Sequence, residues 1–210
     1  IVQAWFLGSE AGSAIASVLL GDVNPSGKLP FTFPVCLEDV GAHELGEYPG
    51  VKRENENIWD AKYNEGIFVG YRWLDKENIK PLFAFGHGLS YTQFEYGKVT
   101  LDSKEMTQDG KIVLTVPVTN VGKREGAEII QLYICDKKSS LSRPEKELKG
   151  FCKVKLAAGE TKTVSFTIDK SSLSFFDDKQ HKWIAEPGKF EAVIAASAED
   201  IKSKTVFELK

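Results

Sequence analysis

Cysteine, methionine, histidine and long apolar runs are all scarce in this sequence of 210 residues. The three cysteines (Cys36, Cys135 and Cys152) have no metal-ligand spacing, and their odd number leaves at least one unpaired within the chain. Every apolar stretch is interrupted well before about 18 residues, which excludes a membrane-spanning helix. The 27 basic and 30 acidic residues nearly balance, so a net charge of −3 does not favour nucleic acid as the main partner.

A disulfide between Cys135 and Cys152 is not expected. Strand alternation in residues 129–135 places Cys135 on the face opposite its aliphatic neighbours. In residues 148–156, Cys152 instead shares a face with the aliphatic residues Leu148, Val154 and Leu156. Reduced thiols fit a cytoplasmic protein, but many exported bacterial proteins also lack disulfides. The compartment therefore stays open: cytoplasmic, periplasmic and secreted locations are all compatible.

The remaining composition is that of a folded protein. Hydrophobic residues make up 42% of the chain and charged residues 27%, which excludes a disordered tail, a collagen-like repeat and a coiled coil. The first ten residues have no initiating Met and no basic head, so they are not a signal peptide. They are typical of a strand that continues from an earlier part of a protein, which suggests a fragment of a longer chain.

Residues 1–34 have an α/β pattern. The apolar run Ile1–Trp5 predicts a buried strand. Residues 11–20 predict a helix that ends at Gly21 and has one apolar face, formed by Ala14, Ile15, Val18 and Leu19. Asn24–Gly27 is a turn signal, and residues 28–34 read as an extended edge strand because they contain two prolines.

The middle of the chain divides into a polar and an aromatic stretch. Residues 35–62 lack hydrophobic periodicity and predict a long surface loop. Residues 63–96 hold the densest aromatic content, and we expect them to join two domains. Gly86 and Gly88 bracket His87, where we expect a sharp bend of the chain.

Residues 98–210 predict about seven short strands separated by turn signals, without any helix-length pattern. This spacing is typical of an antiparallel β-sandwich, and the absence of a Cys–Trp–Cys signature favours a fibronectin type III-like one. Pro117 should place its part of a strand at an edge or a bulge. The expected fold class is α+β, with a remnant of an α/β sandwich over 1–96 and the β-sandwich over 97–210.

Several blocks of the sequence resemble glycoside hydrolase family 3. Residues 4–30 run from A-W-F-L-G-S-E-A-G to G-D-V-N-P-S-G-K-L-P, residues 63–73 read Y-N-E-G-I-F-V-G-Y-R-W, and residues 81–92 read P-L-F-A-F-G-H-G-L-S-Y-T. V-T-N-V-G at 118–122 and Q-L-Y at 131–133 follow in the sandwich half. The blocks occur in the order of that family and cover nearly the whole chain.

The resemblance implies the C-terminal portion of a retaining β-glycosidase that acts on terminal β-linked sugars such as glucose or xylose. Such enzymes join a barrel, an α/β sandwich and a fibronectin-like domain. Retention requires a nucleophilic and an acid/base carboxylate about 5 Å apart. Both would lie upstream, on the barrel and on an earlier sandwich loop, so no catalytic residue is expected here and the chain alone should be inactive. Its partners would be a β-linked glycoside and the missing barrel and sandwich half, with no cofactor, metal, nucleic acid or membrane.

Four residues are candidates for the substrate cleft or an interdomain contact: Ser9, Glu10, Glu65 and Arg72. Ser9 stands where the family commonly has Gln, so a contact of that Gln cannot be carried over. Glu10 precedes a helix, where an anion is favoured, and its alternatives are a helix-start carboxylate, a cleft or barrel contact, and catalysis. Glu65 and Arg72 suggest a structural ion pair or an interdomain contact, with sugar binding as the alternative.

The other aromatic and imidazole side chains give weaker signals. Any of the four tryptophans offers a face for a sugar ring, Trp59 above all, but core or interface packing is the commoner role. The histidines are scattered without metal partners, and His87 fits a turn.

Three hypotheses remain open from the sequence: a glycosidase portion, a carbohydrate- or protein-binding β-sandwich, and a structural brace. Under the first and third, the remnant in residues 1–34 should expose apolar surface at Ile1–Leu7, Ile15 and Leu19, because parallel sheets are buried on both faces.

Overall fold

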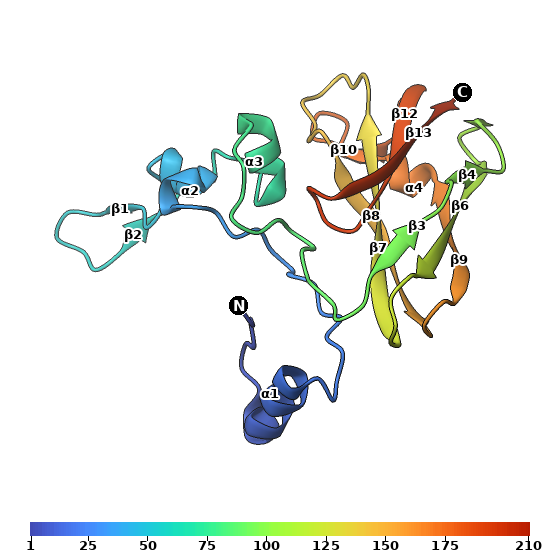
Figure 1. Cartoon of the computed structure of the whole chain (residues 1–210). Helices are drawn as coiled ribbons and strands as arrows, with labels where there is room; N and C mark the ends of the chain where they lie inside the picture. Colours follow the sequence, from blue (N-terminus) through green and yellow to red (C-terminus); the bar gives the residue numbers. More distant parts are fainter.

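A β-sandwich forms the larger part of the computed structural model, which describes residues 1–210. Residues 1–93 lie along one side of this sandwich and extend beyond it (Figure 1). One sheet has the strand order β5-β13-β12-β7-β8, and in the other β6 pairs with β3, β4 and β9. The nine strands are β3 (Phe94–Tyr96), β4 (Thr100–Leu101), β5 (Glu105–Met106), β6 (Lys111–Asn120), β7 (Gly126–Asp136), β8 (Glu147–Leu156), β9 (Thr161–Asp169), β12 (Gly188–Ala195) and β13 (Ile201–Leu209).

The core lies between the two sheets. Alternate residues of β6 point inward, and all four of its apolar inward residues are fully buried: Ile112, Leu114, Val116 and Val118. They belong to one cluster of 19 buried residues. Every pairing between these strands is antiparallel except that of β13 with β5. The predicted antiparallel sandwich is confirmed, and in β6 and β9 the two-residue periodicity of the sequence matches the alternation of buried residues.

Of the two places expected for Pro117, an edge or a bulge, the edge was wrong, because Pro117 lies in a central strand. It pairs with Thr163 of β9 on one side. On the other side, its carbonyl accepts from Gly97 N at 2.8 Å, in the gap between β3 and β4. The nitrogen and carbonyl of one strand residue point to the same side. Any other residue at this position would point its backbone N–H into this gap. The missing N–H of proline costs no strand-to-strand hydrogen bond, because the pairing of β6 is already interrupted there.

A β-bulge in β8 reverses part of the predicted alternation. Leu132 lies opposite Gly150 and Tyr133 opposite Leu148, so Lys149 is the extra residue. Leu148 consequently packs in a second cluster on the outer face of the sheet, whereas Cys152 packs against the main core. The prediction that Leu148 and Cys152 share a face was wrong. All three cysteines are free. Cys135 and Cys152 lie on opposite faces of the sheet, as predicted.

The predicted helix at residues 11–20 is confirmed as α1 (Ala11–Leu20), which follows the single turn η1 (Gly8–Glu10). Gly21 ends α1 in the left-handed conformation, with φ of 85°. The predicted strand Ile1–Trp5 is absent, and Trp5 has φ of 53°, which no strand residue adopts. A strand of a parallel sheet needs neighbouring strands, and this chain supplies none beside it.

Residues 28–34 form no strand. Leu29 N donates to His87 O and Phe33 N to Phe83 O, both at 2.8 Å, so this segment pairs with residues 82–87. The expected edge strand is thus reduced to one isolated bridge, Phe33 with Phe83.

The sequence predicted a plain surface loop over residues 35–62. The structure instead has an arm there, with short helices and strands of its own. These are η2 (Leu37–Asp39), α2 (Gly41–Glu44) and the hairpin of β1 (Val51–Lys52) and β2 (Trp59–Asp60). Arg53 donates two hydrogen bonds of 2.7 Å to Asp60. The hairpin lies at the far end of the arm, away from the sandwich (Figure 1). No helix of the structure is long and apolar enough to cross a membrane.

Candidate functional site

The junction between residues 63–93 and the β-sandwich brings together chemically distinct side chains from distant parts of the sequence. Helix α3 (Tyr71–Glu77) lies against β7 and β8. The Tyr71 ring packs on Tyr133 of β7 and on Phe85, with centroid distances of 5.8 and 5.2 Å. Its hydroxyl accepts a hydrogen bond from Leu148 N at 3.0 Å. One tyrosine thus joins α3 to both the sandwich and the 81–88 segment.

An ionic contact reinforces this aromatic one. Lys146 Nζ donates to both carboxylate oxygens of Asp75 at 2.7 Å, and the two side chains are only 13% and 9% exposed. Burial raises the pKa of the Asp75 carboxyl although the Lys146 ammonium opposes this shift. The desolvation cost therefore offsets much of the attraction, and the pair defines the geometry of the junction more than it stabilises it.

Arg72, a second charged residue of α3, also reaches the β-sandwich across the junction. Its guanidinium lies 3.9 Å from Glu147 of β8. Glu147 in turn pairs with Arg143, which lies 3.2 Å from Asp136. Sequence reasoning missed Asp75, Arg143 and Lys146, because nothing in a local pattern links residues about seventy positions apart.

The 81–88 segment bends sharply at Gly86, as predicted. Gly86 has φ of 78°, and a side-chain carbon there would overlap Gln131 of β7. Gln131 donates to Gly86 O at 3.3 Å, and Ala198 N donates to Phe85 O at 2.8 Å. A side-chain carbon at Gly88 would overlap the Gly27 carbonyl. Both positions require glycine because neighbouring atoms occupy the space that a side chain would need.

The turn that contains Asn24 is a second attachment to the sandwich. Asn24 Oδ1 accepts from Ser90 Oγ at 2.9 Å and from Tyr91 N at 2.8 Å, and its amide donates to Glu125 O. Lys28 pairs with the buried Glu128 of β7 at 3.0 Å. The N-P-S-G-K block therefore has a structural role at the junction.

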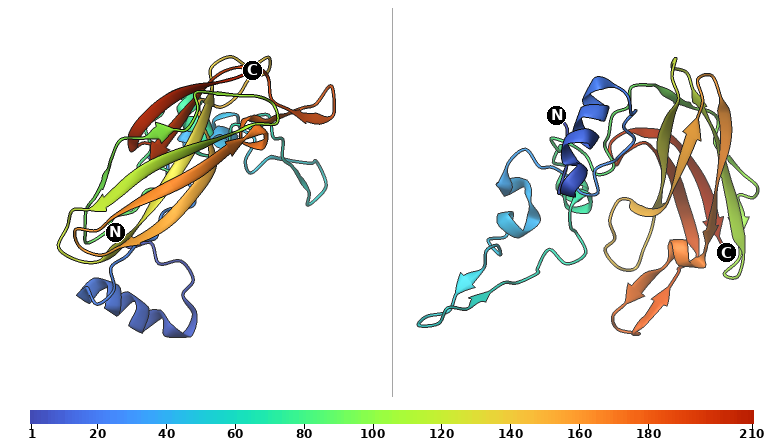
Figure 2. Two further views of the ribbon diagram at one scale, coloured as in Figure 1. Left: turned by 90° about the vertical axis from the view of Figure 1, so that its right-hand side faces the viewer. Right: turned by 90° about the horizontal axis from the view of Figure 1, so that it is seen from below.

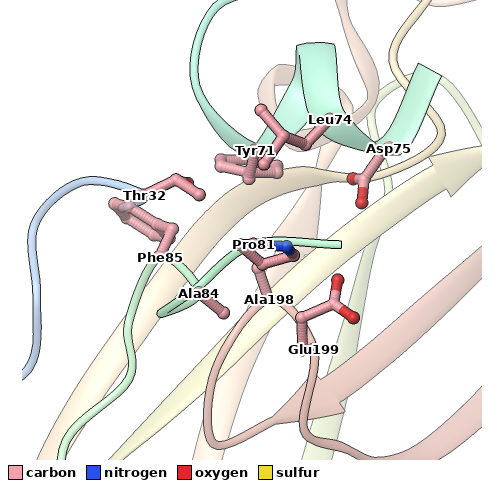
Figure 3. Close-up of a pocket in the computed structure, with 9 residues that line it drawn as sticks. All are labelled: Thr32, Tyr71, Leu74, Asp75, Pro81, Ala84, Phe85, Ala198 and Glu199. Atoms are coloured by element: carbon pink, nitrogen blue, oxygen red, sulfur yellow. The ribbon is translucent and has the colours of Figure 1, made fainter. Parts of the chain in front are cut away.

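A crevice runs along the junction between α3, the 81–85 segment and the loop between β12 and β13 (Figure 3). Tyr71 and Asp75 approach it from α3, and Ala198 and Glu199 from the opposite wall. It leaves no room for a ligand the size of a sugar. It is a packing seam and not a substrate pocket.

The structure does not bring the four predicted residues together by any hydrogen bond or ion pair. Ser9 and Glu10 are exposed in η1. The Glu10 carboxylate accepts from Ser13 Oγ at 2.8 Å, and the same hydroxyl approaches the Glu10 carbonyl at 3.0 Å. Glu10 thus lies at the N-terminal end of α1, and its carboxylate contact stays within the start of the helix.

Glu65 and Arg72 do not pair with each other. Arg72 lies beside Glu147 of β8 instead. Glu65 Oε2 is buried without a hydrogen-bond partner, and so is Trp73 Nε1. A buried carboxylate oxygen without a donor is costly, so Glu65 differs from every other carboxylate of the junction.

The tryptophans divide between core and surface. Trp73 is buried against Gly41. Trp5, Trp59 and Trp183 are 52%, 51% and 68% exposed. No group of histidine, cysteine and carboxylate side chains has the geometry of a metal site.

Exposed apolar surface is concentrated in the first part of the chain. Of the 27 exposed large hydrophobic side chains, 22 lie in residues 1–96. Ile1 and Phe6 are fully exposed, and Leu19 is 61% exposed, as expected; Ile15 is half-buried instead. Exposure on this scale marks an interaction surface.

Known families match both parts of the chain. Residues 1–91 match the glycosyl hydrolase family 3 C-terminal domain, and residues 128–198 match the fibronectin type III-like domain. Residues 1–91 therefore carry the C-terminal domain of glycoside hydrolase family 3. It is 54% identical over 210 residues to a β-glucosidase of Bacteroides ovatus, covering 99% of this chain and 27% of the relative. It is 47% identical over 204 residues to thermostable β-glucosidase B of Acetivibrio thermocellus, covering 97% and 26%.

Solved structures of the family have the same fold. A family 3 β-glucosidase of Bifidobacterium adolescentis superposes with a TM-score of 0.89 at 33% identity, over 99% of this chain and 29% of that one. β-Glucosidase 3B of Thermotoga neapolitana, solved in complex with glucose, gives 0.83 at 36% identity, over 95% and 26%. The chain thus spans about a quarter of the length of these family 3 relatives.

Proposed function

We propose that this chain serves as the C-terminal, non-catalytic portion of a retaining β-glycosidase that hydrolyses terminal β-linked sugars, glucosides first among them. The observation that carries the proposal is the apolar surface of residues 1–96, which needs a large covering partner. The barrel and the remaining half of the α/β sandwich would supply it. The β-glucosidases that match the chain over nearly its whole length support the substrate class.

The carboxylates of the chain support a non-catalytic role. A retaining glycosidase holds its nucleophile and acid/base about 5 Å apart in a cleft. Glu10 is an exposed helix-start residue whose carboxylate accepts a hydrogen bond from Ser13. The buried carboxylate oxygen of Glu65 has no hydrogen-bond partner, so no hydrogen bond links the two glutamates. The catalytic pair would therefore lie in the part of the enzyme that covers residues 1–96.

Within this proposal, the four candidate residues have different roles. Ser9 and Glu10 would line the sugar cleft or the barrel interface, since both are exposed beside the uncovered apolar segment 1–7. The buried, unpartnered oxygen of Glu65 would receive a donor from the covering part. Arg72 would hold α3 on the β-sandwich. The domains would span 1–93 and 94–210, with the boundary three residues before the 96/97 expected from the sequence, because β3 (Phe94–Tyr96) pairs with β6 of the sandwich.

A chimera tests this proposal. The 210-residue chain would replace the matching C-terminal quarter of the Bacteroides ovatus β-glucosidase, to which it is 54% identical. We expect the chimera to hydrolyse an aryl β-glucoside, and we expect neither the chain alone nor the correspondingly truncated relative to do so. Aryl β-xyloside measured in parallel would indicate the preferred sugar. Turnover by the purified chain alone, or a folded chimera without turnover, would contradict the proposal.

A further inference from the structure

Two aromatic side chains on a projecting hairpin of the β-sandwich are left uncovered by the fold. β10 (Phe175–Asp177) and β11 (Lys182–Ile184) pair only with each other, and both views of Figure 2 show this orange hairpin extending beyond the sheets. Phe176 lies directly opposite Trp183 in the register, so both side chains share one face. Their rings meet edge to face at 5.8 Å and are 48% and 68% exposed.

The rest of the hairpin is anchored, so this face is held in place. On its inner side, Phe175 is buried and the Arg143 guanidinium lies 5.2 Å from its ring centroid. At the turn, Asp177 accepts from Lys179 N at 2.9 Å and from the backbone and side chain of Gln180 at 3.1 and 2.6 Å. A short hairpin without such anchors is only marginally stable in water.

Polar groups line the space beside Trp183. The short helix α4 (Lys170–Leu173) and the residue after it contribute Lys170, Ser171 and Ser174, which together with Trp183 border an open hollow. Ser171 Oγ donates to Asp169 at 2.6 Å, and Ser174 Oγ donates to Lys170 O at 2.7 Å. The exposed Ser171 hydroxyl oxygen keeps a lone pair for a ligand, whereas Ser174 is largely buried at the edge of the hollow. The Lys170 ammonium takes part in no ion pair.

The exposed indole of Trp183, with donors and acceptors beside it, matches the chemistry of a sugar ring. In β-linked glucose units the hydroxyls are equatorial, so the C–H groups of either ring face can lie on an indole while the hydroxyls reach the rim. A purely apolar partner would cover the Lys170 ammonium and the Ser171 hydroxyl without offering them a further hydrogen bond. We propose that Trp183, with Phe176 beside it and Lys170, Ser171 and Ser174 at its rim, forms a binding platform for chains of β-linked glucose. The choice of sugar rests on the proposed function.

Affinity electrophoresis of the 210-residue chain tests this platform directly. Native gels would contain soluble mixed-linkage β-glucan, α-linked dextran or no polysaccharide. We expect β-glucan, and not dextran, to retard the chain, and we expect Trp183→Ala to lower the apparent affinity at least tenfold. Trp183→Phe, which keeps a smaller aromatic face, should lose less.

Phe151→Ala is the matched control, since Phe151 of β8 is an equally exposed aromatic residue, at 70%. It should bind β-glucan as the unaltered chain does. The apolar surface of residues 1–96 is common to all variants and cancels in these comparisons. Binding requires no turnover, so this result is independent of whether the chimera hydrolyses a glucoside. Absence of retardation by β-glucan, equal retardation by dextran, or unchanged binding by Trp183→Ala would each overturn the proposal.

Discussion

At the scale of single residues, close approach decides which positions of the junction tolerate change. Gly86 combines a left-handed backbone, with φ of 78°, and direct contact with the Gln131 side chain. Gly159, in the turn between β8 and β9, has nearly the same φ of 77° but open space around it. A side chain at Gly86 would meet both backbone strain and steric overlap, whereas a side chain at Gly159 would meet backbone strain alone.

We predict that Gly86→Ala detaches the 81–88 segment from the sandwich. A left-handed alanine costs about 1 kcal/mol, and overpacking against Gln131 adds about 1–3 kcal/mol. Limited proteolysis within residues 80–92 should accelerate at least tenfold. Gly159→Ala should leave cleavage there unchanged, because it pays only the backbone cost at a remote turn. A Gly86→Ala chain as resistant as the unaltered one would show that this contact does not hold the junction.

Much of this residue detail could be predicted and some could not. The bend at Gly86 and the free thiols of Cys135 and Cys152 followed from local composition and alternation. The place of Pro117 did not, because the gap between β3 and β4 that accommodates it is a property of the neighbouring strands. Leu148 was misplaced because a bulge leaves no signal in strand alternation.

At the scale of elements, α3 depends on the β-sandwich for its position. Tyr71, Arg72 and Asp75 all contact β7, β8 or the loop between them. Sequence patterns predicted α1 and the long strands, which carry their own periodicity. They missed α2, α3 and the hairpin of β1 and β2, since elements this short are set by tertiary contacts and local hydrogen bonds.

We predict that Lys146→Ala releases α3. Removing one partner of a buried ion pair costs about 3–5 kcal/mol because the other charge stays buried alone. Amide hydrogen exchange in Tyr71–Glu77 should therefore accelerate about a hundredfold or more. The double variant Asp75→Leu/Lys146→Met should recover most of the protection, since it leaves no unpaired charge.

Lys137→Ala serves as the control, because Lys137 is 47% exposed and its pair with Glu191 lies at the surface. Such a pair contributes about 1 kcal/mol or less. If Lys146→Ala left the exchange of α3 unchanged, the ionic contact would have no part in docking.

At the scale of the whole molecule, the two parts differ in how complete they are. The β-sandwich encloses a core of 19 buried residues. Residues 1–96 hold most of the exposed apolar side chains and few buried ones. Sequence reasoning predicted this asymmetry, because a parallel-sheet remnant lacks neighbours for its apolar faces. It could not locate a substrate site, since the residues that would complete one are not in this chain.

The central claim is that this chain supports catalysis without supplying the reacting carboxylates. The most direct test measures kcat of the chimera on an aryl β-glucoside after Glu10→Gln and, separately, after Glu65→Gln, with and without added azide. The account predicts that kcat stays within about tenfold of the unaltered chimera and that azide has no effect, because neither carboxylate touches the reacting atoms. A loss of kcat of about a thousandfold or more that azide restores would identify that glutamate as catalytic and contradict the account.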